Sequence, residues 1–193
     1  GLSGDKIAPA DFDGDGKVDV AVYRPSSGVW YVLRSSDGQN TIAQFGISED
    51  LPVQADYDGD GKADFAVFRP SSGTWYILQT SDGGETIIPF GLIADKPVAG
   101  DFDADGKADL AVFRPGERIW YFLKSTQGFS TVQFGLSGDK PLQADFDGDG
   151  IRHIAVFRPE TSVWYYLKSS DGSFAFRQFG LDGDTPVPSI FVR

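Results

Sequence analysis

Aspartates recur in this chain at a spacing that suits a hard cation. Asp11, Asp13, Asp15 and Asp19 occupy positions 1, 3, 5 and 9 of a nine-residue segment, and the backbone carbonyl of Lys17 stands at position 7. Oxygen ligands at these alternate positions wrap one Ca²⁺, and a glycine at position 6 allows the sharp turn. No glutamate stands at position 12 and no helical pattern flanks the segment, so it is not an EF-hand. The spacing predicts a calcium-binding loop.

The same nine-residue pattern returns three times. With the position-7 residues contributing a backbone carbonyl, the further candidate ligands are Asp56, Asp58, Asp60, Lys62, Asp64, Asp101, Asp103, Asp105, Lys107, Asp109, Asp145, Asp147, Asp149 and Ile151. Without a counter-ion such crowded carboxylates repel one another, and some would stay protonated. The alternative is a set of solvated Asx turns. Because Mg²⁺ demands strict octahedral geometry, Ca²⁺ suits these loops better.

Two of the loops depart from the pattern. Ala104 stands at position 4 of the third loop, where the other loops have glycine, and this predicts strain in the turn. In the fourth loop His153 replaces the position-9 carboxylate. We therefore expect three strong calcium sites and one weaker site.

The loops belong to an internal repeat whose copies are 45, 45 and 44 residues apart. Each loop is followed by an Ala-Val-aromatic-Arg-Pro segment, a Trp-Tyr pair and a Phe-Gly end. Within a repeat, short β-branched and aromatic runs alternate with turns, and apolar residues never recur at helical spacing. Four short antiparallel strands per repeat of ~45 residues are typical of a β-propeller blade.

The sequence therefore predicts an all-β protein, a β-propeller of four four-stranded blades of ~45 residues plus a surplus C-terminal strand. It predicts a single repeat domain over residues 1–193, with blades at approximately 7–46, 52–91, 97–135 and 141–180. The alternatives are part of a larger ring, completed by a second chain, or an open repeat stack.

A fifth repeat begins near the end of the chain and then changes. Residues 186–192 correspond to the first strand of a blade, but apolar residues follow where the other copies have aspartate. An unpaired apolar strand must find a sheet edge. It either closes its own ring as a clasp or adds to a neighbouring molecule. The residues predicted for this assembly are Pro186, Val187, Ile190, Phe191 and Val192.

Two other residue types recur once per blade. The arginines that precede proline are Arg24, Arg69, Arg114 and Arg158. They suit an ion pair between blades or a hydrogen bond to loop carbonyls, or else a ring of donors for a sugar acid or another carboxylate ligand. The repeated tryptophans are Trp30, Trp75, Trp120 and Trp164. They suit core packing, or else a platform on which sugars stack.

The acidic loops, the Ala-Val-Phe-Arg-Pro strands and the Phe-Gly ends resemble FG-GAP repeats of the VCBS type over nearly the whole chain. Such repeats occur in integrin α-subunit propellers and in many bacterial secreted proteins. The resemblance implies propeller blades with one Ca²⁺ per intact loop and an extracellular or cell-surface setting. It implies no single activity.

The composition limits which classes of binding partner and which types of catalysis are expected. A net charge of −11 disfavours binding to nucleic acid or to an anionic membrane surface. No apolar run approaches the ~20 residues that cross a bilayer. The absence of cysteine excludes thiol catalysis, and the single histidine lies in the altered fourth loop, where a Ser-His-Asp triad is not expected. We therefore expect no enzyme activity.

The sequence favours a secreted, calcium-stabilised structural or interaction protein. Its predicted partner is itself, in a homo-oligomer or filament that uses the terminal strand, or else a surface glycan or protein. One alternative is a lectin-like carbohydrate-binding propeller with pockets between its blades. Another is a non-catalytic module of a larger secreted enzyme.

Overall fold

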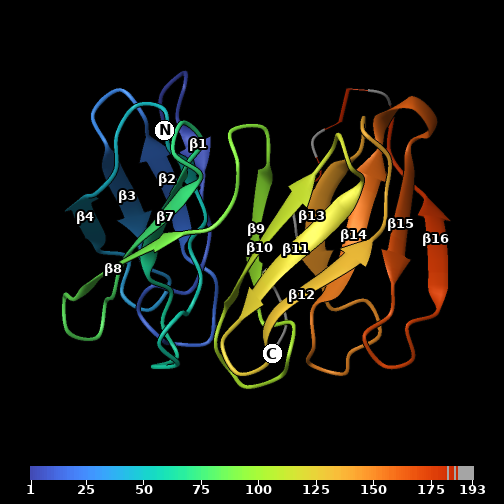
Figure 1. The fold of residues 1–193 in the computed structure, drawn as a ribbon. Helices are drawn as coiled ribbons and strands as arrows, with labels where there is room; N and C mark the ends of the chain where they lie inside the picture. Colours follow the sequence, from blue (N-terminus) through green and yellow to red (C-terminus); the bar gives the residue numbers. More distant parts are fainter. Residues whose placement is uncertain (182, 185, 187–193) are drawn as a thin grey trace. The chain divides into compact units, whose positions relative to one another are not determined.

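Each sequence repeat folds into one antiparallel sheet of four strands, which follow one another across the sheet in chain order (Figure 1). The computed structural model describes residues 1–181, 183–184 and 186. Within these residues the only helical element is a 3₁₀ turn, η1 (Pro159–Thr161). The predicted all-β class and the four four-stranded blades are confirmed.

The chain divides into two compact units of two blades each, and the single repeat domain over residues 1–193 stays a prediction. The first unit, Gly1–Ile93, holds the first blade (β1–β4) and the second blade (β5–β8). Its strands are β1 (Lys6–Ile7), β2 (Val20–Arg24), β3 (Val29–Leu33), β4 (Asn40–Gln44), β5 (Leu51–Pro52), β6 (Phe65–Arg69), β7 (Thr74–Leu78) and β8 (Glu85–Pro89).

The second unit, Ala94–Arg193, holds the third blade (β9–β12) and the fourth blade (β13–β16). Its strands are β9 (Lys96–Gly100), β10 (Asp109–Arg114), β11 (Ile119–Lys124), β12 (Gly128–Gln133), β13 (Lys140–Ala144), β14 (His153–Arg158), β15 (Val163–Leu167) and β16 (Phe174–Gln178). Of the predicted assembly residues, Pro186 is described, whereas Val187, Ile190, Phe191 and Val192 lie outside the described residues.

The Phe-Gly end of a blade packs against the turn between its second and third strands. Gly28 and Gly73 lie in these turns with φ of 65° and 61°. A β-carbon on Gly28 would lie 2.3 Å from the carbonyl oxygen of Gly46, and one on Gly73 would lie 2.2 Å from that of Gly91. The left-handed backbone and the close approach both require glycine in these two turns.

Within each unit, one blade packs its apolar face on the next blade. In the first unit, the rings of Phe12 and Trp30 in the first blade lie 5.0 and 5.5 Å from that of Phe65 in the second blade. In the second unit, Trp120 of the third blade shares a core with Val156 of the fourth blade. The core therefore lies between sheets, as radial repetition of blades requires.

Candidate metal sites

Each acidic loop joins the first strand of a blade to the second. Its ends are held by sheet pairing between the residue before position 1 and the residue at position 9. Ala10 pairs with Asp19 and Ala55 with Asp64 through isolated bridges. The equivalent residues of the third blade, Gly100 and Asp109, pair within the β9–β10 ladder. The sheet therefore fixes both ends of every loop.

The carboxylate of the position-1 aspartate accepts backbone hydrogen bonds from within its own loop. The amides of Gly14 and Gly16 donate to the two carboxylate oxygens of Asp11, at 2.7 and 2.8 Å. The corresponding bonds form at Asp56, Asp101 and Asp145. The loops are thus held as Asx-type turns, and these turns aim the other carboxylates toward one centre.

In every loop three ligand atoms lie within 4.8 Å of one another. The four clusters are Asp11, Asp13 and Asp15; Asp56, Asp58 and Asp64; Asp101, Asp103 and Asp109; and Asp145, Asp147 and His153. The position-5 carboxylate belongs to the cluster of the first loop, and the position-9 residue belongs to the clusters of the other three. The structure therefore brings together the position-1 and position-3 ligands in all four loops.

The remaining predicted ligands have other contacts. Asp19 is fully buried, and its two carboxylate oxygens accept hydrogen bonds from the amides of Phe12 and Ser35 at 2.8 and 2.7 Å. Asp60, Asp105 and Asp149 accept hydrogen bonds from the position-7 amides of Lys62, Lys107 and Ile151. The position-7 carbonyls, including that of Lys17, stay predicted ligands.

The electrostatics of the second and third loops fit a bound cation. Burial raises the pKa of the Asp56, Asp64 and Asp109 carboxyls, and neighbouring carboxylates raise it further. One carboxylate oxygen of Asp103 is buried without a hydrogen-bond partner. A Ca²⁺ would supply the missing partner and the compensating charge, because its ligands are oxygens of this kind.

The third and fourth loops differ from the others as the sequence indicated. Ala104 has φ of 65°, in the left-handed region that a side chain makes costly. His153 is fully buried. Its Nδ1 accepts a hydrogen bond from the amide of Phe146 at 3.4 Å, and its Nε2 lies 3.3 Å from a carboxylate oxygen of Asp147. An imidazole suits Ca²⁺ less well than a carboxylate does.

Hydroxyl groups from a neighbouring turn donate hydrogen bonds to the carboxylates of each loop, and the sequence did not predict them. In the first blade Ser36 donates to Asp13 at 2.6 Å, and Ser35 donates to Asp15 at 2.9 Å. The turn between the third and fourth strands supplies the corresponding donors of the other blades, which are Ser81, Ser125, Thr126, Ser169 and Ser170. The detectable signal was a Ser/Thr pair that recurs after the third strand of every blade.

A second missed element pairs with the repeated arginines. An aspartate 19 residues upstream of each arginine accepts hydrogen bonds from its guanidinium group, at 2.8–3.0 Å, and a tyrosine ring lies 4.1–4.4 Å from the guanidinium carbon. We name these sets the arginine staples: Asp5, Arg24 and Tyr31; Asp50, Arg69 and Tyr76; Asp95, Arg114 and Tyr121; Asp139, Arg158 and Tyr165. Each arginine thus pairs with the aspartate that precedes the first strand of its own blade, and not with a neighbouring blade as the sequence suggested. This favours the ion-pair role over ligand binding.

Three of the four tryptophans are core residues. Trp30, Trp75 and Trp120 are fully buried, so their ring faces are not open to a sugar. The indole N–H of Trp75 donates to the carbonyl oxygen of Phe90 at 2.8 Å, which ties the third strand to the Phe-Gly end. Trp164 makes the equivalent bond to Phe179 at 3.0 Å but is only partly buried. A ring of equivalent stacking platforms is therefore not present at these four residues.

The four-stranded sheets, the packing of one blade on the next and the acidic loop after each first strand define a β-propeller protein whose loops carry residues that could hold a metal ion. The FG-GAP-like repeat matches residues 56–139, and the FG-GAP repeat matches residues 3–43. The chain belongs to the FG-GAP repeat proteins.

Comparison with solved structures agrees on the fold. A streptogramin B lyase is 13% identical with a TM-score of 0.60, and 92% of this chain covers 55% of that one. The virginiamycin B lyase of Staphylococcus aureus is 10% identical with a TM-score of 0.58, and 90% of this chain covers 55% of it. An Agrocybe aegerita lectin that recognises non-reducing terminal N-acetylglucosamine is 18% identical with a TM-score of 0.57, and 86% of this chain covers 49% of it.

This chain thus spans about half the length of those structures, and at these identities the likeness shows the fold alone. No curated protein matches the sequence. Among the described residues, no helix has the length and apolar character needed to cross a membrane.

Proposed function

We propose that this chain is a calcium-stabilised, non-catalytic structural or interaction module that acts outside the cell or at its surface. The observation that carries the proposal is a preformed acidic loop, repeated in all four blades, in which three ligand atoms gather within 4.8 Å. Calcium that binds only the folded loops stabilises the blades by mass action.

The charge balance supports calcium as the partner of the loops. Four bound Ca²⁺ would bring eight positive charges and move the net charge from −11 to −3. Calcium modules of the extracellular space work with dissociation constants of about 10⁻⁴–10⁻³ M. Small, solvent-facing loops with three clustered ligands suit that range, which supports an extracellular or cell-surface setting.

The single histidine and the repeated arginines are held in structural contacts. His153 is fully buried inside the fourth loop, and the four repeated arginines are held in staples. Carboxylates that hold Ca²⁺ are not free to transfer protons. These arrangements support a binding role, although lyases share the fold.

Calcium titration by calorimetry, together with thermal unfolding in calcium, in magnesium and in chelator, tests this proposal. We expect three strong sites and one weaker one, and a higher melting temperature in calcium than in magnesium. A site held at 100 times its dissociation constant contributes about 2.7 kcal/mol to folding.

A matched pair of variants in the second blade sharpens the test. Asp58→Asn removes a carboxylate of the cluster and should abolish one site, whereas Asp82→Asn changes an exposed aspartate of the β7–β8 turn and should abolish none. If the wild type has the same melting temperature in calcium and in chelator, calcium does not stabilise the protein and this part of the proposal is wrong.

The predicted assembly element is the terminal strand. Pro186 is partly buried, and the other residues predicted for assembly, Val187, Ile190, Phe191 and Val192, lie outside the described residues. If this strand joins molecules, a chain that ends at residue 185 will be a monomer at every concentration, whereas the full chain assembles. Equal masses for the two chains would refute assembly through the strand.

A further inference from the structure

The fourth acidic loop differs from the other three in the chemistry of its ligand cluster. Asp145, Asp147 and His153 each offer one ligand atom, and these atoms lie within 4.8 Å of one another. The clusters of the other three loops consist of aspartates alone. Two carboxylates and a neutral imidazole carry one negative charge fewer than three carboxylates do, so a single divalent cation neutralises the fourth cluster.

His153 turns one ring nitrogen toward the carboxylate of Asp147. Its side chain is fully buried, and its Nε2 lies 3.3 Å from Oδ2 of Asp147. The geometry of this pair does not make a hydrogen bond, so Nε2 is buried without a hydrogen-bond partner. A buried polar atom without a partner costs free energy. A metal ion bound to both Nε2 and the carboxylates would remove that cost.

The separation of the two atoms fits a shared metal ion. Zn²⁺ binds imidazole nitrogen and carboxylate oxygen at about 2.0–2.2 Å in a tetrahedral arrangement, so two of its ligand atoms lie about 3.3–3.5 Å apart. The 3.3 Å between Nε2 of His153 and Oδ2 of Asp147 has this value. The hydroxyl of Ser170 donates to the same Oδ2 at 3.0 Å, which orients the carboxylate.

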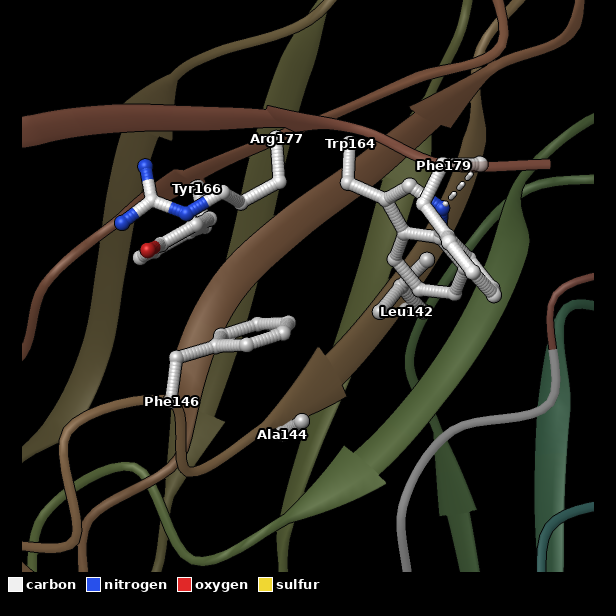
Figure 2. Close-up of a pocket in the computed structure, with 7 residues that line it drawn as sticks. All are labelled: Leu142, Ala144, Phe146, Trp164, Tyr166, Arg177 and Phe179. Carbon is white, nitrogen blue, oxygen red and sulfur yellow. Dashed lines mark hydrogen bonds between the residues drawn. The ribbon is translucent and has the colours of Figure 1, made fainter.

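Two aromatic rings hold the imidazole in this orientation. The ring of His153 lies 5.6 Å from that of Phe146, edge to face, and 5.9 Å from that of Tyr166. Phe146 and Tyr166 also stack on each other with ring centres 4.4 Å apart. Figure 2 shows these two rings together in the wall of a pocket of the fourth blade. A ligand whose ring is fixed by packing is preorganised for a metal ion.

The second ring nitrogen of His153 makes only a long contact. Nδ1 accepts a hydrogen bond from the amide of Phe146 at 3.4 Å, beyond the usual range of about 2.7–3.2 Å. A metal ion on Nε2 requires the proton of the neutral imidazole to be on Nδ1, so this bond would be lost. In the first three loops the position-9 carboxylate accepts the corresponding bond at 2.8–3.0 Å. The imidazole therefore gives up less than those carboxylates would.

The fourth loop is poorly suited to calcium. Ca²⁺ takes about six to eight oxygen ligands and binds more tightly as their negative charge increases, and His153 supplies neither oxygen nor charge. At position 8, Arg152 replaces the valine or alanine of the other loops, and its guanidinium interacts electrostatically with Asp145. This positive charge further weakens an ion that is held by charge alone. An imidazole is instead a preferred ligand of zinc and its neighbours among the transition metals.

We propose that the fourth loop binds a divalent transition metal ion of the zinc type, with the carboxylates of Asp145 and Asp147 and Nε2 of His153 as its ligands. Carboxylates together with imidazole suit Zn²⁺, whereas carboxylate and carbonyl oxygens suit Ca²⁺. The fourth blade is then stabilised by a different ion from the first three. This site needs only the residues of one loop, so it does not depend on the calcium-stabilised module proposed above.

Zinc titration by calorimetry, in saturating calcium and on a chain without a histidine tag, tests the proposal. With calcium present to occupy the first three loops, we expect one strong zinc site per chain. His153→Gln should bind zinc at least about 100-fold more weakly, because losing a group that only orients a ligand already costs 10–100-fold in affinity. Circular dichroism verifies that this buried substitution has folded.

A second pair of variants changes exposed positions, where folding should survive. Asp147→Asn removes a carboxylate of the cluster and should also weaken zinc binding, by about 100-fold or more. Asp171→Asn changes an exposed aspartate of the β15–β16 turn and should bind zinc as the wild type does.

The single histidine of the chain provides a direct readout. In nitrogen-15 NMR spectra the imidazole signals belong to His153 alone. One equivalent of Zn²⁺ should shift the signal of Nε2 and leave the proton on Nδ1. Mg²⁺, which prefers oxygen ligands, should leave both signals unchanged.

Three results would overturn the proposal. They are imidazole signals that zinc leaves unchanged, a zinc affinity that His153→Gln leaves unchanged, and a zinc-induced shift that an equal concentration of calcium reverses. The second result would place the zinc on surface carboxylates. Calcium that neither binds nor stabilises the chain would instead refute the calcium-stabilised module, and the shift of the His153 signal would still decide the zinc site.

Discussion

The substitution His153→Asp should convert the weak fourth calcium site into a strong one. The variant should then be more stable than the wild type in calcium and less stable than the wild type in chelator. In the second and third loops the position-9 aspartate joins the ligand cluster and also accepts backbone hydrogen bonds from the loop and from the neighbouring turn. His153 accepts one long bond from Phe146. An aspartate in its place would supply both the missing ligand and the missing acceptor.

The expected magnitudes depend on whether the ion is present. Without calcium, the new carboxylate would stand within about 5 Å of those of Asp145 and Asp147, where like charges at an effective dielectric constant of 20 repel by roughly 3–4 kcal/mol per pair. Hydrogen bonds to a charged acceptor contribute about 1.5–3 kcal/mol each and offset part of this. The variant should therefore be less stable than the wild type in chelator, by about 1–3 kcal/mol.

With calcium, the order of the two proteins should reverse. Filling the repaired site at 100 times its dissociation constant contributes about 2.7 kcal/mol, and the ion also cancels the repulsion. For a chain of this size, each kcal/mol corresponds to about 2–4 °C of melting temperature. The measurement is a pair of thermal unfolding curves, in calcium and in chelator, for the wild type and for His153→Asp.

The reciprocal variant Asp109→His provides the control. It should weaken the third site and reduce the gain in stability from calcium. If His153→Asp shifts the melting temperature by the same amount in calcium and in chelator, the position-9 carboxylate does not act through the metal, and the reasoning is wrong.

Three other predictions follow from the loops and the staples. Ala104→Gly should raise the free energy of unfolding by about 0.5–1 kcal/mol, because removing left-handed strain outweighs the added backbone freedom of glycine; denaturant unfolding measures it, and a loss of stability would contradict the strain. Ser81→Ala should weaken calcium binding at the second site by about tenfold, since the hydroxyl orients the Asp58 carboxylate; calorimetry measures it against Ser72→Ala, which should bind as the wild type does. Hydrogen bonds from Arg24 hold the pKa of Asp5 at about 2, below the ordinary 3.8, so the folded state should lose stability as the pH falls from about 4 to 2. In chelator, the free energy of unfolding of Asp5→Asn should fall less steeply over this pH range than that of the wild type. Equal pH dependence of the two proteins would show that the staple does not contribute to it.

The acidic loops were predictable because their chemistry is local in sequence. Asp56 and Asp58 reach the same centre through a single turn, so their spacing alone placed them together. The repeat then fixed the number of blades, since an antiparallel hairpin pairs neighbouring segments. His153 and Ala104 were recognised as departures for the same reason, by comparison with the equivalent positions in the other copies.

The partners of those residues were less predictable because they are distant in sequence. Ser81 follows Asp58 by 23 residues, and Asp50 precedes Arg69 by 19. Their contacts depend on how strands pack side by side. The repeated arginine suggested both a structural role and a ligand-binding one, and only the observed position of Asp50 distinguishes between them. The lower burial of Trp164 was likewise not predictable, because its sequence context matches that of the three fully buried tryptophans.

The reach of each arginine staple has a genetic consequence. Asp50, Arg69 and Tyr76 span 27 residues and lie inside one repeat. The backbone hydrogen bonds between packed blades use the same two repeat positions in each pair of blades. A recombination event that adds or removes one whole repeat of DNA therefore restores every staple and the positions that pack one blade on the next, wherever in the repeat its endpoints fall. A gene of this kind can therefore gain or lose one blade in a single step. No intermediate sequence arises in which a buried aspartate of a staple lacks its arginine.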